Sequence, residues 1–168
     1  MFYLYLHYYL KQIAMYLTLL LLHSTVRWLV LLSLFYSIIR AYRGYQNKSS
    51  FSKTDNVVRH WTATIAHLQL MLGIVLYSQS TLIKYFWNNF AEASKDLSTL
   101  FFGLIHLILM LAAIIIITIG SAAAKRKTLD SDKFKTMFIW FSIALLLIFI
   151  AIPWPFSPLA NRPYFRPL

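Results

Sequence analysis

The chain has 168 residues, of which 60% are hydrophobic and only 12% are charged. A soluble domain carries about 25% charged residues, so this chain has too little polar surface for a soluble globular fold. It has no cysteine, which excludes disulfides, thiolate metal sites and iron–sulfur clusters. The formal net charge is +11, but the basic residues concentrate in short loops, where they fix the topology of a membrane protein. We therefore expect no binding to nucleic acid.

Four apolar stretches predict four membrane-spanning helices, over residues 15–39, 61–77, 97–120 and 138–152. Each is close to the roughly 20 residues that cross the hydrocarbon core. The fourth is short and is expected to extend back into residues 135–137, and Pro153 ends it because proline cannot continue a helix. The fold class that follows is all-α, an integral membrane four-helix bundle covering residues 15–155.

The remaining segments lie outside this domain. Residues 1–14 are apolar and aromatic, and we expect them either to lie at the membrane interface or to lengthen the first span. Residues 156–168 are rich in proline, which predicts an extended tail on the outer surface. Polar residues at 54–56 and 128–131 are expected to cap the second and fourth spans.

The loops predict the orientation. Basic residues crowd the first and third connections, whereas the second connection has only Lys84 and Lys95, offset by Glu92 and Asp96. The positive-inside bias therefore places the first and third connections in the cytoplasm and both termini on the outer side.

Three histidines lie within the predicted spans, at positions 23, 67 and 106. A helix rises about 1.5 Å per residue, which places His23 roughly 25 Å and His106 roughly 28 Å from the cytoplasmic edge, but His67 only about 12 Å from it. His23 and His106 thus share a level in the outer half. They meet the depth requirement for a bis-histidine haem, whose two imidazoles come from facing helices.

A plainer alternative stays open, in which each histidine only donates to a backbone carbonyl of a neighbouring helix. His67 has no histidine at its own level within the spans, so a ligand partner for it would be a methionine from another helix, His60 or a residue of another subunit. The fourth span offers little polar chemistry beyond Ser142 and is expected to face lipid or to act as a clamp.

Arg27 is the second unusual residue, one turn from His23 on the same helix face. All five acidic residues lie in loops, and a buried arginine without a carboxylate is costly. A haem propionate, a quinone oxygen, a lipid headgroup or a partner subunit's carboxylate would relieve that cost. Alternatively, the first span begins near His23, which would put Arg27 among the outer headgroups.

Several short motifs resemble a family of small four-span bacterial membrane proteins labelled cytochrome b or cytochrome b561-like. The residues that carry the likeness are His23–Ser24 with Arg27–Trp28, then His67, Gln69, Gly73 and Leu76–Tyr77, then residues 117–120 with Lys125–Arg126, and finally Ile152–Pro153–Trp154–Pro155. The resemblance covers most of residues 15–155 and implies His23, His67 and His106 as candidate ligands. The chain departs from that pattern at Ile105, where an acid is expected, and it lacks the paired histidines of a two-haem core.

These observations predict a multi-pass protein of a bacterial inner membrane that works as a b-type cytochrome-like or redox-complex subunit, without catalysis of its own. It would hold at most one haem b, with His23 and His106 as ligands and Arg27 near a propionate. The alternatives are a cofactor-free accessory subunit that scaffolds a larger complex and a quinone- or lipid-binding module using Arg27 and His67. We expect its partners to be the lipid bilayer and either other membrane subunits or further copies of the chain.

Overall fold

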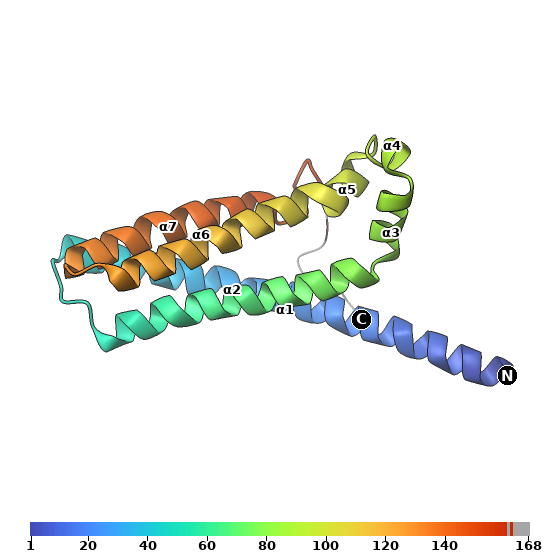
Figure 1. Ribbon diagram of the computed structural model, residues 1–168, viewed down its shortest axis with the longest axis horizontal. Helices are drawn as coiled ribbons and strands as arrows, with labels where there is room; N and C mark the ends of the chain where they lie inside the picture. Colours follow the sequence, from blue (N-terminus) through green and yellow to red (C-terminus); the bar gives the residue numbers. More distant parts are fainter. Residues whose placement is uncertain (161, 163–168) are drawn as a thin grey trace.

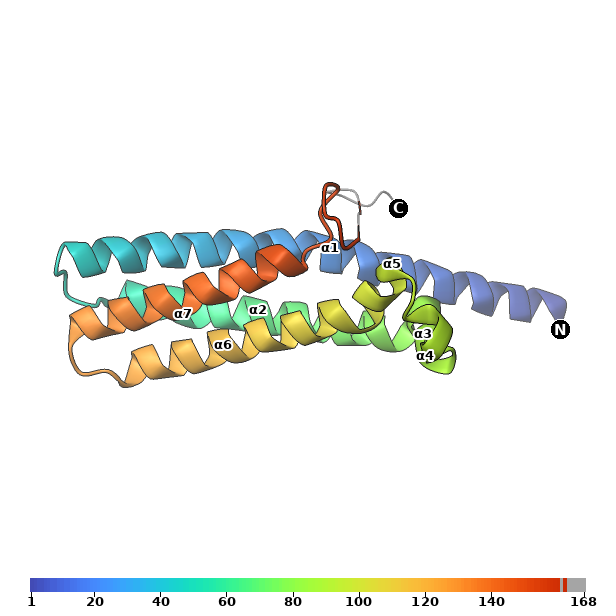
Figure 2. The same cartoon turned by 90° about the horizontal axis from the view of Figure 1, so that it is seen from above.

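The computed structural model describes residues 1–160 and 162, and this part of the chain contains helices and no strand. Four of the helices are long and apolar enough to cross a membrane, which confirms the predicted number of spans. Figures 1 and 2 show them as one elongated bundle. The elements are α1 (Phe2–Gln46), α2 (Lys53–Gln79), α3 (Thr81–Asn88), α4 (Phe90–Ala93), α5 (Leu97–Leu100), the π-helix η1 (Phe101–Ile105), α6 (His106–Arg126) and α7 (Asp130–Ala151).

The order of the long helices around the bundle decides which residues can meet. Helix α1 packs against α2 and α7, and α6 packs against the same two helices. Helices α1 and α6 therefore lie on a diagonal and face each other across the bundle axis (Figure 2).

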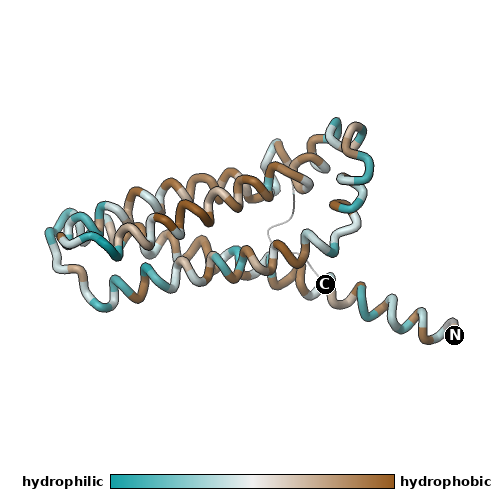
Figure 3. The backbone as a smooth tube through the Cα atoms, viewed as in Figure 1, coloured by the Kyte–Doolittle hydropathy of each residue, from teal (hydrophilic) through white to brown (hydrophobic). Residues whose placement is uncertain are grey.

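The two ends of the bundle differ. One end, here called the basic end, carries the connections 47–52 and 127–129 (Figure 1). The other, here called the terminal end, carries α3, α4 and α5, the end of α7 and the projecting start of α1. Hydrophilic residues gather at the basic end and around α3 and α4, and the bundle between them is largely hydrophobic (Figure 3). This distribution suits a bundle that crosses a bilayer.

Helix α1 is one continuous helix of 45 residues, so residues 1–14 continue the helix of the first predicted span. At 1.5 Å per residue it is about 68 Å long, roughly twice the thickness of the hydrocarbon core. Its N-terminal part extends beyond the other helices (Figure 1). The predicted boundary between residues 14 and 15 is therefore not a break in secondary structure.

The helix starts correct two sequence predictions. The N-cap of α2 is Ser52, and Asp55 completes a capping box with it instead of serving as the cap. The N-cap of α7 is Leu129, and its side chain makes no capping bond. Helix α7 begins at Asp130, further back than the predicted extension to residue 135.

Packing at the basic end is dense and includes a hydrogen bond and an ion pair between helices. Ser37 and Thr62 share a buried hydrogen bond of 2.6 Å between α1 and α2. Arg40 Nη2 lies 2.7 Å from Asp55 Oδ1, which is an ion pair between the same two helices. These contacts hold α1 and α2 close together at the basic end, so the bundle can enclose a cavity only toward the terminal end.

Helix α7 is a core element and not a lipid-facing one. Its residues Phe134, Met137, Phe141 and Ala144 are buried between α1 and α6. The sequence left two interpretations of this span open, a lipid-facing helix or a clamp, and the buried side chains of α7 favour the clamp.

Candidate functional site: a cavity between two histidines

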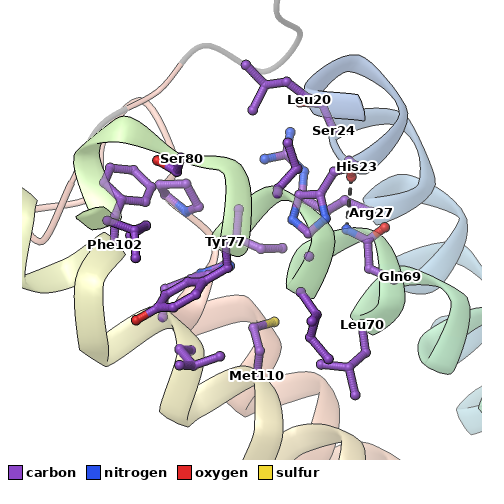
Figure 4. A pocket seen from close by; sticks show the side chains of 18 of the residues that line it. Leu20, His23, Ser24, Arg27, Gln69, Leu70, Tyr77, Ser80, Phe102 and Met110 are labelled. Carbon is purple, nitrogen blue, oxygen red and sulfur yellow. Dashed lines mark hydrogen bonds between the residues drawn. The ribbon is translucent and has the colours of Figure 1, made fainter. Parts of the chain in front are cut away.

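A cavity of about 340 Å³ lies at the terminal end of the bundle, between α1, α2, α3, α6 and the end of α7. Its wall is mainly apolar, with a few polar side chains that include His23, Arg27, Gln69, Tyr77 and His106. Figure 4 shows His23, Arg27 and Gln69 on one side and Tyr77, Ser80 and Phe102 on the other, with Met110 and Leu70 at its base. A mostly apolar hollow with few convergent polar groups is typical of a small-molecule or cofactor site.

The two histidines at matched depth do meet in the structure. The ring centres of His23 and His106 lie 6.5 Å apart, with an angle of 71° between the ring planes. They reach toward each other from the diagonal helices α1 and α6, so each ring approaches the bundle axis from an opposite side. Their placement in one cavity shows that the two residues share a level of the bundle, as the residue counts predict.

His106 is fixed by a carbonyl at the end of α7. Its Nδ1 lies 2.8 Å from the backbone oxygen of Ala151, so the ring donates from Nδ1 and keeps the lone pair of Nε2. The Ala151 carbonyl is available because its helical partner would be the N–H of residue 155, and Pro155 has none. The proline thus frees the acceptor that sets the tautomer of His106.

The second proline of the same motif has a parallel effect. Pro153 cannot bond the carbonyl of Phe149, and the indole Nε1 of Trp154 donates to that carbonyl instead, at 2.8 Å. Trp154 also packs edge-on against Trp28 of α1, with ring centres 6.0 Å apart. The Ile152–Pro153–Trp154–Pro155 motif therefore ends α7 and ties that end to α1 and α6.

The turn before His106 is a π-helix, and short π-helical turns occur often at functional sites. The carbonyl of Gly103 in this turn accepts a 2.7 Å hydrogen bond from the hydroxyl of Tyr77, which in turn accepts from Trp87 Nε1 at 2.8 Å. Gly103 is required here because a Cβ would lie about 2.5 Å from the ring of Phe86. The backbone that presents His106 is thereby bound to both α2 and α3.

His23 is held differently. The amide of Gln69 donates to the backbone oxygen of His23 at 2.8 Å, as the dashed line in Figure 4 shows, and this contact fixes the main chain but not the ring. The Nδ1 edge of the ring faces Gly73, where a Cβ would lie 3.2 Å from Cε1 and 3.7 Å from Nδ1. Nδ1 is buried and has no hydrogen-bond partner within the described chain.

Arg27 lies on the cavity wall one turn from His23, as its spacing predicts. Its Cζ lies 5.3 Å from the centre of the Trp28 ring, a cation–π contact. Arg162 also reaches the wall, with its Cζ 4.9 Å above the ring of Phe102. Both guanidinium groups could meet a ligand carboxylate, and no feature of the sequence predicts the position of Arg162.

His67 is outside the cavity. Its Nε2 lies 2.9 Å from Thr118 Oγ1 on α6, and that hydroxyl donates to the carbonyl of Ile114 at 2.7 Å. His67 therefore donates to Thr118 and ties α2 to α6. His67 is not among the residues that line the cavity, whereas Arg27, His23 and His106 are.

Residues 1–160 and 162 contain no group of three or more histidine or carboxylate side chains that could hold a metal ion. The cavity therefore offers two imidazoles to one metal, and further ligands would have to come from a cofactor. The predicted outer tail lies only partly in the described chain, since residue 161 and residues 163–168 are outside it. Residues 155–156 form a turn, so the described part of the tail is not simply extended.

The chain matches no protein-family model, no curated protein sequence and no solved structure.

Proposed function

We propose that the chain is a small electron-transfer subunit of a membrane redox complex that holds one haem b between His23 and His106. The observation that carries the proposal is the spacing of the two rings. An imidazole nitrogen binds a transition metal at about 2 Å and lies a little over an ångström from its own ring centre, so two rings on opposite sides of one ion have centres about 6 Å apart. The rings of His23 and His106 are 6.5 Å apart.

The donor set supports a macrocycle more than a bare metal ion. Protein sites for zinc use three or four protein ligands, whereas a haem iron needs only two axial ligands because the macrocycle supplies the others. The apolar wall suits a flat hydrophobic ring, and Arg27 on that wall would hold a propionate. When bound, the haem supplies one-electron chemistry.

The chain's own contribution would be to orient the two imidazoles, to exclude water and to set the electrostatics. His106 keeps one tautomer through Ala151, and a carbonyl that accepts from the non-ligating N–H of a ligating ring raises the basicity of that ring. The likeness of its motifs to small cytochrome b561-like proteins points to the same function. We place the protein in a bacterial inner membrane with the terminal end outside, on the basis of the loop charges.

The test is the haem content of the purified full-length chain, expressed with haem supplied. We expect one haem per chain in the wild type, its loss in His106→Ala, and its retention in His67→Ala. The last variant is the matched control, because it removes a span histidine that lies outside the cavity. A wild type without haem would contradict the proposal, and so would haem loss in His67→Ala with retention in His106→Ala.

A cofactor-free scaffold subunit is the second candidate, and one observation favours it. Residues 1–15 precede the first α1 residue that lines the cavity, Tyr16, and they project about 22 Å past it with exposed aromatic side chains such as Tyr3, Tyr5 and Tyr8. An apolar surface of this kind suits contact with another membrane subunit. Deletion of residues 2–14 should then abolish co-purification of partner subunits in mild detergent, and a haem-free, stable monomer in the full-length chain would count against this candidate.

A further inference from the structure

The two histidines differ in how firmly the fold holds them. The Nδ1–H of His106 donates a hydrogen bond to the backbone oxygen of Ala151. His106 also follows a π-helical turn in which the Gly103 carbonyl accepts a hydrogen bond from the Tyr77 hydroxyl. His23 has no such support for its ring within the described chain, since its Nδ1 is buried beside Gly73 without an acceptor. The asymmetry arises from two local features of the sequence, a proline that frees a carbonyl and a glycine that offers no side chain.

This difference matters for metal binding. Loss of the hydrogen bond from the non-ligating N–H of a ligating imidazole typically costs about 10–100-fold in metal affinity, because the acceptor orients the ring and raises its basicity. When His23 ligates through Nε2, its Nδ1 carries a proton that has no acceptor in this buried position. Ligation by His23 is therefore disfavoured relative to ligation by His106.

The cavity also gives an incoming molecule a place beside His23. Its wall on this side is formed by Leu20, Ser24, Arg27 and Gly73, and Gly73 leaves room that any larger residue would reduce. A small uncharged molecule with a donor lone pair could enter this mainly apolar space, because its entry does not remove a charge from water.

Resting on the proposed haem site, we propose that His106 is the fixed axial ligand and His23 the exchangeable one, so that a small neutral diatomic ligand such as carbon monoxide displaces His23. The exchange breaks the bond between His23 Nε2 and the ferrous iron and forms a bond between iron and the carbon of carbon monoxide. The His23 ring leaves as a neutral imidazole, and no electron or proton is transferred.

The first experiment is carbon monoxide binding to the reduced, haem-loaded full-length protein, followed by its absorption spectrum. We expect wild type to bind carbon monoxide at a rate that saturates with concentration, because the departure of His23 limits it. His23→Ala should retain haem and bind at a rate that rises linearly and is at least about tenfold faster at high concentration. A wild type that keeps both ligands at saturating carbon monoxide would overturn the inference, as would haem loss in His23→Ala with retention in His106→Ala.

The second experiment keeps both histidines and so does not depend on a variant that loses a ligand. Gly73→Ser places a hydroxyl acceptor beside Nδ1 of His23, and Gly73→Ala adds the same Cβ without the acceptor. Relative to Gly73→Ala, we expect Gly73→Ser to weaken carbon monoxide binding by about tenfold or more. Equal affinity in the two variants would contradict the inference while leaving the haem site standing, whereas a wild type without haem would remove the site itself and this inference with it.

Discussion

The guanidinium of Arg59 is buried at the basic end and is held by neutral oxygens. Its Nη1 donates to the hydroxyl and to the backbone oxygen of Ser121 on α6, and its Nη2 donates to Asn56 at 2.8 Å. The side chain is 5% exposed. A buried charge with few partners makes each remaining hydrogen bond matter more than at the surface.

Ser121→Ala should therefore destabilise the bundle by about 1–3 kcal/mol, since the buried guanidinium loses a hydroxyl acceptor that nothing replaces. The measurement is the thermal unfolding midpoint in detergent. Ser142→Ala is the control, because Ser142 is a half-buried serine of α7 outside this network. Equal midpoints for the two variants would show that the Arg59 contact contributes little.

Single residues also show what the sequence could reveal about the site. The equal level of His23 and His106 follows from counting residues along two helices, and in the structure their rings lie 6.5 Å apart. The acceptor of His106 is a main-chain oxygen, which no side-chain motif identifies, although Pro155 four residues after Ala151 marks that carbonyl as free. His67 gave no signal of its role, because a hydrogen bond to Thr118 depends on which faces of α2 and α6 meet.

At the scale of elements, the second connection is the largest departure from a simple loop. It folds into α3, α4 and α5, and Phe86 of α3 is fully buried against Gly103 of the π-helical turn. Sequence periodicity cannot predict this, because the segment is short and its helices are stabilised by contacts with α2 and η1. Helix α7 was equally ambiguous, since Phe and Met suit both lipid and a protein core.

The start of α5 offers a pH-dependent prediction. Asp96 is its N-cap, and its carboxylate accepts from the backbone N–H of Thr99 at 2.7 Å and from the hydroxyl of the same residue. These two bonds lower the pKa of Asp96 below its ordinary value of 3.8. Because the folded-state pKa is depressed, the cap is complete above pH 3.8 and is lost as the pH falls through the lower, folded value.

Amide hydrogen exchange of residues 97–100 measures this directly. In wild type, protection should decrease on acidification below pH 3.8, after correction for the intrinsic exchange rate. Asp96→Asn keeps a capping side chain that does not titrate, so its corrected protection should stay constant over the same range. A parallel fall in both proteins would mean that another group, not Asp96, controls the start of α5.

At the scale of the whole molecule, the sequence predicts the number of spans. It also predicts that the N-terminus and the C-terminal end of α7 lie at the same end of the bundle. Hydropathy identifies each span and loop charge gives its direction, and these two properties are sufficient for both predictions. The diagonal placement of α1 and α6 could not be predicted, because it depends on the packing of four helices at once. That arrangement, more than any single motif, turns two histidines at equal depth into one site.

The membrane orientation can be tested with introduced cysteines, since the chain has none of its own. Asn88→Cys lies exposed at the end of α3, and Ser49→Cys lies exposed in the connection 47–52. In intact cells a membrane-impermeant maleimide should label Asn88→Cys at once and Ser49→Cys only after permeabilisation. The reverse pattern would invert the orientation that the loop charges predict.

The central claim is that His23 and His106 together bind one haem iron across the bundle. The most direct measurement is the electron paramagnetic resonance spectrum of the oxidised, purified full-length protein expressed with haem supplied. We expect a low-spin ferric signal of the type given by two imidazole ligands, at about one haem per chain and lost in His106→Ala. A wild type with no haem, or with only a high-spin signal, would contradict it.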